Sequence, residues 1–169
     1  AFHGVPTMFI AMLEHKDFAT TDFSHMRTGI MAGSPCPIKV MQDVIEKMHM
    51  PEICITYGQT EASPGCTMSK TTDSIEDRVN TVGGAMFGVE CKIVDPETGK
   101  ELPDNVDGEF VARGYNIMKG YYKMPHATAQ AIDADGWLHT GDLARRLPNG
   151  YFKITGRIKD MIIRGGENI

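Results

Sequence analysis

The hydrophobic and polar positions in the first third of the chain predict alternating strands and helices. Short apolar runs at residues 27–34 and 52–58 each lead into a glycine, which is typical of buried strands. Between them, residues 38–50 carry apolar side chains at helical spacing, with charged residues on the opposite face. Ser34 is positioned to cap this helix, and Pro6 suits the first turn of an earlier one. A strand, a helix and a strand joined by short links predict one βαβ unit of a parallel sheet.

From about residue 81 the pattern changes to short alternating runs separated by glycine-rich turns. This pattern predicts a small antiparallel sheet or barrel. The expected strands lie within residues 89–96, 108–114, 136–147 and 150–157. The intervening stretch, residues 69–84, is polar and is predicted to be a loop between two subdomains. The expected fold class is therefore α/β, with a parallel βαβ layer in residues 1–80 and an antiparallel β-subdomain in residues 81–156.

Composition narrows the class of protein. The 169 residues are 41% hydrophobic and 23% charged, as in soluble globular proteins. The net charge of −5 argues against a nucleic-acid partner, and no apolar run approaches the roughly 20 residues that span a bilayer. The four cysteines form no C-x-x-C pair and have no histidine cluster nearby, which argues against zinc and favours buried thiols.

Candidate chemistry gathers where the two predicted strands end, at the edge of a parallel sheet where ligands bind. Gly33 lacks a Cβ, so a flat ligand could approach the backbone there, next to a helix N-terminus that favours anions. After the second strand, Tyr57 offers a ring for stacking and Gly58 lets the chain bend. Thr60 can donate to a phosphate oxygen, and Glu61 can bind Mg²⁺. Alone, this string favours a packed tyrosine, a turn-capping threonine and a solvated glutamate over a binding site.

Further polar groups follow along the chain. Asp142 comes after a glycine, where its carboxylate could accept hydrogen bonds from the vicinal hydroxyls of a ribose. The last 14 residues supply Arg157, Lys159 and Arg164, followed by two adjacent glycines. A turn carboxylate and solvated cations are the plainer interpretation of each, but together with the strand ends they favour a nucleotide site.

The ordered motifs GIMAGSP, TYGQTE, GEFVARGYNIMKGYYKMPHAT, GWLHTGDL and GRIKDMIIRGGENI closely resemble the adenylate-forming superfamily. That superfamily contains acyl-CoA synthetases, aryl-CoA ligases, adenylation domains of peptide synthetases and luciferase. The N-terminal motifs look most like the medium- and long-chain acyl-CoA synthetases. The resemblance implies a ligase that uses ATP and Mg²⁺ to form an acyl-adenylate from a carboxylic acid, and then transfers the acyl group to coenzyme A. The acid is expected to be a fatty acid.

The resemblance also implies roles for individual residues. Gly33, Ser34 and Pro35 would form the wall against the adenine, Tyr57 would stack on its other face, and Gly58 would lie near the acyl carbonyl. Thr60 would hold the α-phosphate, Glu61 the magnesium, and Asp142 the ribose hydroxyls with help from Arg157. Lys159 matches the hinge position, and Gly165 and Gly166 match the loop that lines the pantetheine tunnel. Residues 157–169 are accordingly expected to be a hinge and the start of a further domain.

Two parts of the superfamily pattern are absent from these residues: the phosphate loop upstream and the C-terminal domain beyond GGENI. The chain is therefore expected to be an internal fragment that is itself inactive and self-associates through exposed apolar faces. Two further activities remain open, namely an aryl-acid CoA ligase and an adenylate-forming enzyme with another acceptor. An inactive nucleotide-binding module is the alternative for the isolated piece. The expected compartment is the cytoplasm, or the mitochondrial matrix in a eukaryote.

Overall fold

The structure is a computed structural model that describes residues 1–158, 163–164 and 167–168. By its internal contacts, the chain divides into two compact units. The first contains Ala1–Tyr57 and Thr67–Gly83, and the second contains Gly58–Cys66 and Gly84–Ile169. Each unit has its own sheet and its own buried core.

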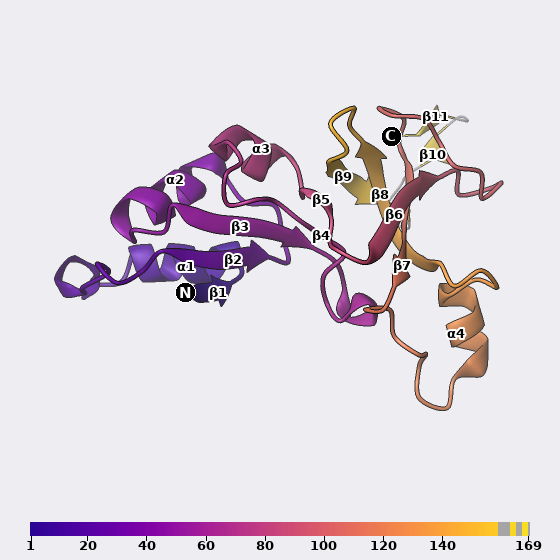
Figure 1. Ribbon diagram of the computed structural model, residues 1–169, viewed down its shortest axis with the longest axis horizontal. Helices are drawn as coiled ribbons and strands as arrows, with labels where there is room; N and C mark the ends of the chain where they lie inside the picture. Colours follow the sequence, from indigo (N-terminus) through magenta and orange to yellow (C-terminus); the bar gives the residue numbers. More distant parts are fainter. Residues whose placement is uncertain (159–162, 165–166, 169) are drawn as a thin grey trace. The chain divides into compact units, whose positions relative to one another are not determined.

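The first unit is built on a sheet of three parallel strands, extended by a short antiparallel one (Figure 1). Along the chain its elements are β1 (Phe2–Gly4), α1 (Pro6–Leu13), a 3₁₀ turn (Phe18–Thr20), β2 (Thr28–Ala32), α2 (Ile38–Lys47), β3 (Glu52–Tyr57), β4 (Thr67–Met68) and α3 (Ile75–Asn80). β2 runs parallel to both β1 and β3. The predicted βαβ unit is thus confirmed as β2–α2–β3.

The core of this unit lies between the sheet and the helices. The apolar spacing of residues 38–50 predicted a buried helix face, and Met41, Val44 and Met48 are indeed almost fully buried. They pack with Phe9 of α1 and with apolar residues of β2 and β3 in one cluster. Pro6 opens α1, as predicted. The expected cap at Ser34 is wrong, because α2 begins only at Ile38 and follows Pro37, with no side-chain cap.

The polar stretch 69–84 is not simply a loop, because it contains the helix α3 (Ile75–Asn80). Its N-cap is Ser74, whose hydroxyl oxygen accepts a hydrogen bond from the Asp77 amide at 3.0 Å. Ile75 and Val79, four residues apart, pack against the core. A helix of six residues, fewer than two turns, leaves room for only two apolar positions, so the polar residues dominated the pattern.

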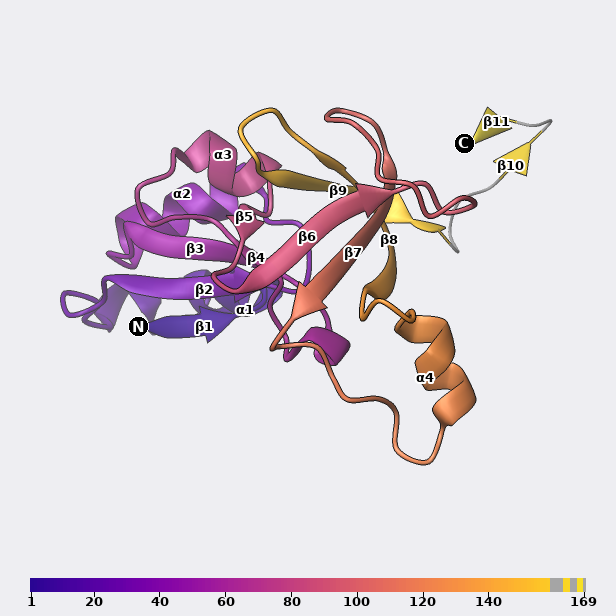
Figure 2. The ribbon, with the colours of Figure 1, turned by 45° about the vertical axis from the view of Figure 1, so that its right-hand side comes forward.

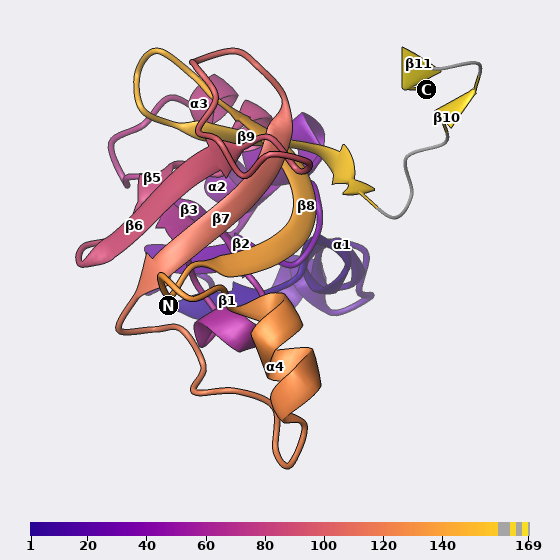
Figure 3. The ribbon, with the colours of Figure 1, turned by 90° about the vertical axis from the view of Figure 1, so that its right-hand side faces the viewer.

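The second unit contains a four-stranded antiparallel sheet in the order β6-β7-β8-β9, with all four predicted strands present (Figures 2 and 3). Its elements are a 3₁₀ turn (Thr60–Ala62), β5 (Gly84–Ala85), β6 (Val89–Val94), β7 (Gly108–Gly114), α4 (Pro125–Ala131), β8 (Leu138–Arg146), β9 (Phe152–Arg157), β10 (Ile163–Arg164) and β11 (Glu167–Asn168). The sheet is open rather than a closed barrel. Phe110 and Phe152 meet edge to face at 5.1 Å in its core. Among the described residues, no helix is long and apolar enough to cross a membrane.

The four cysteines are free thiols. As predicted, each of them is buried or half-buried. Burial raises the pKa of Cys36 and Cys66 to about 11, and it also raises the pKa of Cys91. The thiolate is the reactive form, and at pH 8 a thiol with such a pKa is about 0.1% ionised. We therefore expect Cys36 and Cys66 to resist alkylation by iodoacetamide at pH 8 and to react once urea unfolds the protein. Rapid labelling of either residue in the folded protein, followed by mass spectrometry, would contradict this.

Candidate functional site

In the first unit, two predicted site segments lie at neighbouring strand ends. Ala32, the last residue of β2, is in register with Thr56 of β3. Gly33 and Tyr57 are the next residues along the two segments, at the same edge of the sheet. Gly33 adopts φ +87°, a conformation that favours glycine, and an added Cβ would lie 3.2 Å from Val5. The exposed Ser34 and Pro35 continue from it. Gly33, Ser34 and Pro35 are therefore exposed at this edge of the sheet, and their contact with a flat ligand stays a prediction.

The anion-binding helix end expected beside Gly33 is displaced. α2 begins at Ile38, so the segment from Gly33 to Pro37 is an irregular link rather than the first turn of the helix. The prolines at positions 35 and 37 explain the displacement, because each fixes its own φ and disfavours helix in the residue before it.

In the second unit, the loop Gly58–Cys66 carries Thr60 and Glu61 on a single 3₁₀ turn. Gly58 packs so tightly that an added Cβ would collide with the Pro64 carbonyl. Thr60 is exposed and Glu61 is half-buried. The Glu61 carboxylate accepts a hydrogen bond of 2.7 Å from the Tyr121 hydroxyl through Oε1. The two predicted phosphate and metal residues are thus adjacent and presented on the same short turn.

The residues present fit magnesium only when the ion is bound together with a nucleotide. In the described part of the chain, no three His, Cys, Asp or Glu residues cluster in a way that could hold a metal ion. Mg²⁺ often binds through one or two carboxylates, with the remaining positions filled by substrate phosphates and water. Glu61, next to Thr60, meets that requirement for a Mg²⁺–nucleotide complex.

Asp142 lies on a bulge of β8. Glu109 of β7 is in register with Leu143 and Val111 with His139, so Phe110 alone faces the three residues from Thr140 to Asp142. Gly141 makes the turn with φ +71°. The Thr140 hydroxyl donates to the Phe110 carbonyl at 2.6 Å. A bulge of this kind changes the direction in which a side chain of the strand points. Here the side chain affected is that of Asp142.

A buried carboxylate holds this bulge from the neighbouring strand. Glu109 accepts a hydrogen bond from the Gly141 amide at 3.0 Å through Oε1, and its Oε2 lies 2.8 Å from Nδ1 of His139. His139 in turn lies 3.5 Å from Asp133 through Nε2. Burial by itself would raise the pKa of Asp133, but hydrogen bonds from backbone amides and from His139 together outweigh it and lower the pKa. Glu109 therefore orients both residues that flank Thr140.

Asp142 pairs with Arg157 across β8 and β9. The Arg157 Nε lies 3.2 Å from Oδ1 of Asp142, and the two residues are in register. The Asp142 side chain is 13% exposed, whereas that of Arg157 is 72% exposed. The structure thus brings these two predicted ribose-binding residues together. The remaining predicted residues, Lys159, Gly165 and Gly166, lie outside the described residues.

Sequence reasoning missed three residues that hold the site. They are Glu109 beneath the Asp142 bulge, and Asn116 and Tyr121 beside Glu61. All three belong to the motif GEFVARGYNIMKGYYKMPHAT. A glutamate followed by a strand of apolar residues was the signal for Glu109, since such a side chain must find donors when the sheet buries it.

Comparison with known families places these residues in context. The family model described as AMP-binding enzyme matches residues 1–122. A Bacillus subtilis protein, YngI, a candidate acyl-CoA synthetase by name, is 59% identical over 99% of this chain and 30% of its own length. The mitochondrial medium-chain acyl-CoA ligase ACSF2 of Bos taurus is 46% identical over 99% of this chain and 27% of its own length. The chain therefore spans less than a third of these relatives.

Two solved structures are similar to this chain over almost its full length. ATP-bound MatB from Rhodopseudomonas palustris matches 99% of this chain and 32% of its own, with a TM-score of 0.84 and 35% identity. The anthranilate CoA ligase AuaEII, in complex with anthranoyl-AMP, matches 99% of this chain and 31% of its own, with a TM-score of 0.85 and 28% identity.

Proposed function

Because the chain belongs to the family of AMP-binding enzymes, we propose that it is part of an AMP-forming acid–thiol ligase that makes an acyl-CoA. The observation that carries the proposal is that Gly33 and Tyr57 each come directly after the in-register pair Ala32 and Thr56, at the ends of adjacent parallel strands. Strand ends of this kind are where open α/β sheets bind nucleotides. The identity of 59% with an acyl-CoA synthetase relative supports the same conclusion.

The proposed reaction has two steps. A carboxylate oxygen of the acid attacks the α-phosphorus of ATP, and the bond to pyrophosphate breaks to give an acyl-adenylate. The thiol sulfur of coenzyme A then attacks the acyl carbonyl, AMP leaves, and the thiol proton passes to solvent. Positioning and charge stabilisation supply most of the rate in such phosphoryl chemistry.

We assign the residues of the first unit to the base. The open backbone of Gly33, Ser34 and Pro35 would lie against the adenine. Tyr57, at the end of the next strand, would stack on the opposite face. Apart from Gly58–Cys66, which belong to the second unit, residues 1–80 would thus form the C-terminal part of a nucleotide- and acyl-binding subdomain.

The second unit would hold the sugar and the phosphates. Asp142 accepts hydrogen bonds from the ribose hydroxyls, with Arg157 fixing its carboxylate. Thr60 donates to the α-phosphate, and Gly58 lies near the acyl carbonyl. Glu61 holds Mg²⁺, which screens the charge of the phosphates when bound.

The later residues complete the proposed division of the chain. Residues 81–156 form the β-subdomain, and residues 157–169 form the hinge. Lys159 occupies the hinge position, while Gly165 and Gly166 line the path of the coenzyme A pantetheine.

The acid is proposed to be an alkyl, fatty acid. This choice rests on the 46% identity with a medium-chain acyl-CoA ligase, compared with 28% for the anthranilate CoA ligase. An aryl acid is the second candidate, favoured by the TM-score of 0.85 with that ligase.

The bacterial and mitochondrial relatives support a cytoplasmic or a mitochondrial-matrix location. In the isolated chain, exposed apolar side chains such as Phe87 and Tyr122 favour self-association, and nucleotide binding without turnover is the expected behaviour.

The reaction class is tested with the full-length protein that contains this chain. We expect an acid such as octanoate to drive exchange of labelled pyrophosphate into ATP in the absence of coenzyme A. Adding coenzyme A should then yield one AMP for each thioester. Formation of ADP and phosphate instead would rule out the adenylate route, and exchange driven only by benzoate-type acids would favour the aryl ligase.

A further inference from the structure

One segment of the second unit, Asn116–Tyr121, contacts the Glu61 turn at three points. Asn116 is 7% exposed, and its Nδ2 donates to the carbonyls of Ala62 at 3.0 Å and Gly65 at 2.7 Å. The Met118 amide donates to the Glu61 carbonyl at 2.7 Å. The Tyr121 hydroxyl reaches the Glu61 side chain itself. We call this segment the brace.

The orientation of Asn116 is fixed by its surroundings. Only the amide nitrogen can donate to two carbonyls, so the side-chain oxygen must point the other way. That Oδ1 is buried and, within the described residues, has no hydrogen-bond partner. A buried amide that leaves its oxygen unpaired is costly, and the two bonds to the loop offset this cost. Asn116 is therefore committed to the turn that carries Glu61.

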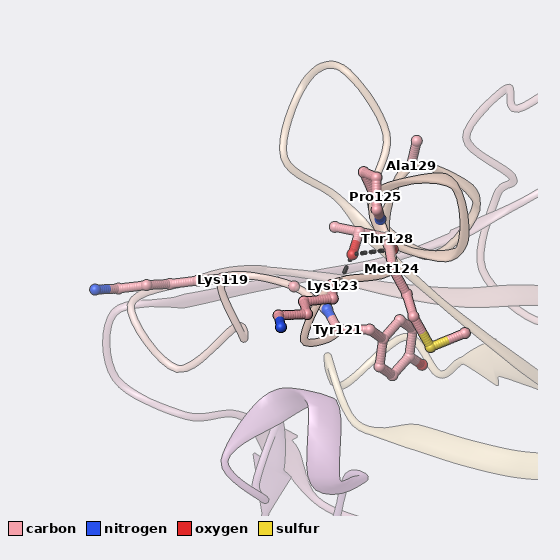
Figure 4. A pocket seen from close by; sticks show the side chains of 8 residues that line it. Lys119, Tyr121, Lys123, Met124, Pro125, Thr128 and Ala129 are labelled. Carbon is pink, nitrogen blue, oxygen red and sulfur yellow. Dashed lines mark hydrogen bonds between the residues drawn. The ribbon is translucent and has the colours of Figure 1, made fainter.

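Tyr121 holds the carboxylate without neutralising it. Its hydroxyl lies 2.7 Å from Oε1 of Glu61, and a carboxylate has lone pairs on both oxygens. A neutral phenol leaves the negative charge available for a cation, whereas an arginine would not. Tyr121 belongs to a pocket that is lined by the loop before α4 and by α4 itself (Figure 4).

We propose that Asn116 and Tyr121 are positioning residues for Glu61: Asn116 fixes the backbone of its turn, and Tyr121 fixes the carboxylate for a Mg²⁺–nucleotide complex. The proposal rests on the proposed function, in which Glu61 holds the metal. Ligating carboxylates are commonly oriented by a second hydrogen-bonding group, and losing that group weakens metal affinity or activity by about tenfold or more.

The first experiment compares Tyr121→Phe with Tyr122→Phe in the full-length protein. Tyr122 is the matched control, because the residue is 85% exposed and its ring lies under the Lys123 ammonium rather than against Glu61. We expect the Mg²⁺ concentration for half-maximal pyrophosphate exchange to rise roughly tenfold in Tyr121→Phe. It should be unchanged in Tyr122→Phe, and saturating Mg²⁺ should restore most of kcat in Tyr121→Phe. An unchanged or lower Mg²⁺ requirement in Tyr121→Phe would overturn the assignment of Tyr121.

The second experiment does not depend on turnover. Hydrogen–deuterium exchange of the Gly58–Cys66 peptide should accelerate at least about tenfold in Asn116→Ala, because the turn loses both buried hydrogen bonds. Peptides from β6 and β7 should keep their exchange rates. Unchanged exchange of Gly58–Cys66 would overturn the brace even if the wild type is an active ligase. Faster exchange in a wild type that forms no adenylate would instead retain the brace and reject the proposed function.

Discussion

Replacing Asp142 with alanine in the full-length protein should weaken AMP binding by at least about a hundredfold. In the proposed site, the carboxylate accepts hydrogen bonds from two ribose hydroxyls, and each bond to a charged group contributes on the order of 1.5–3 kcal/mol. Arg157 holds Oδ1 at 3.2 Å and the bulge at Gly141 presents the side chain, so the group is already oriented before the ligand binds. Isothermal titration with AMP measures the loss directly.

The matched control is Asp107→Ala. Asp107 also pairs with an arginine of the same sheet, Arg145, at 2.6 Å, but it is more exposed and lies outside the proposed site. Its removal should leave the AMP affinity within about twofold, since exposed ion pairs contribute little. Deoxyadenosine monophosphate, which lacks the 2′-hydroxyl, should bind the wild type more weakly than AMP does. The Asp142→Ala variant should bind the two nucleotides with almost equal affinity. If Asp142→Ala binds AMP as tightly as wild type, the ribose assignment is wrong.

Periodicity alone was enough to predict the sheets and the helix α2. The apolar positions of residues 38–50 are governed by burial against the parallel strands, and the alternating runs after residue 88 by one buried sheet face. Where elements are too short to show a period, the pattern was uninformative. The six residues of α3 and the three residues of β1 are examples.

Candidate site residues could be predicted where the chemistry lies at a strand end or a glycine turn. Gly33, Tyr57 and Asp142 are of this kind, since their neighbours in sequence determine where they lie. The supporting residues could not be found this way. Tyr121 is 60 positions from Glu61, and Asn116 is 54 positions from Ala62, so only the tertiary fold makes these contacts visible.

Arg78 belongs to the same class of hidden residue, and we expect Arg78→Met to destabilise the first unit by about 3 kcal/mol. Arg78 is 5% exposed, although it lies in the polar stretch that was expected to be a loop between two subdomains. One guanidinium nitrogen, Nη1, donates to the carbonyls of Pro51 at 2.8 Å and Ile53 at 3.0 Å. The other, Nη2, donates to the Thr71 carbonyl at 2.5 Å. Methionine would keep the apolar stem but leave three carbonyls without their donor. Urea denaturation followed by circular dichroism measures the change.

The geometry also explains why lysine should not rescue the loss. The three carbonyls come from the start of β3, the turn before it and the loop leading to α3, and a planar fork reaches all of them from one position. A single ammonium can satisfy only part of this set, so Arg78→Lys should still cost about 2 kcal/mol. Arg145→Met, which removes an exposed ion pair in the second unit, should cost less than about 1 kcal/mol. Equal effects of Arg78→Met and Arg145→Met would mean that water replaces the guanidinium, and that α3 is attached to the sheet by its apolar face alone.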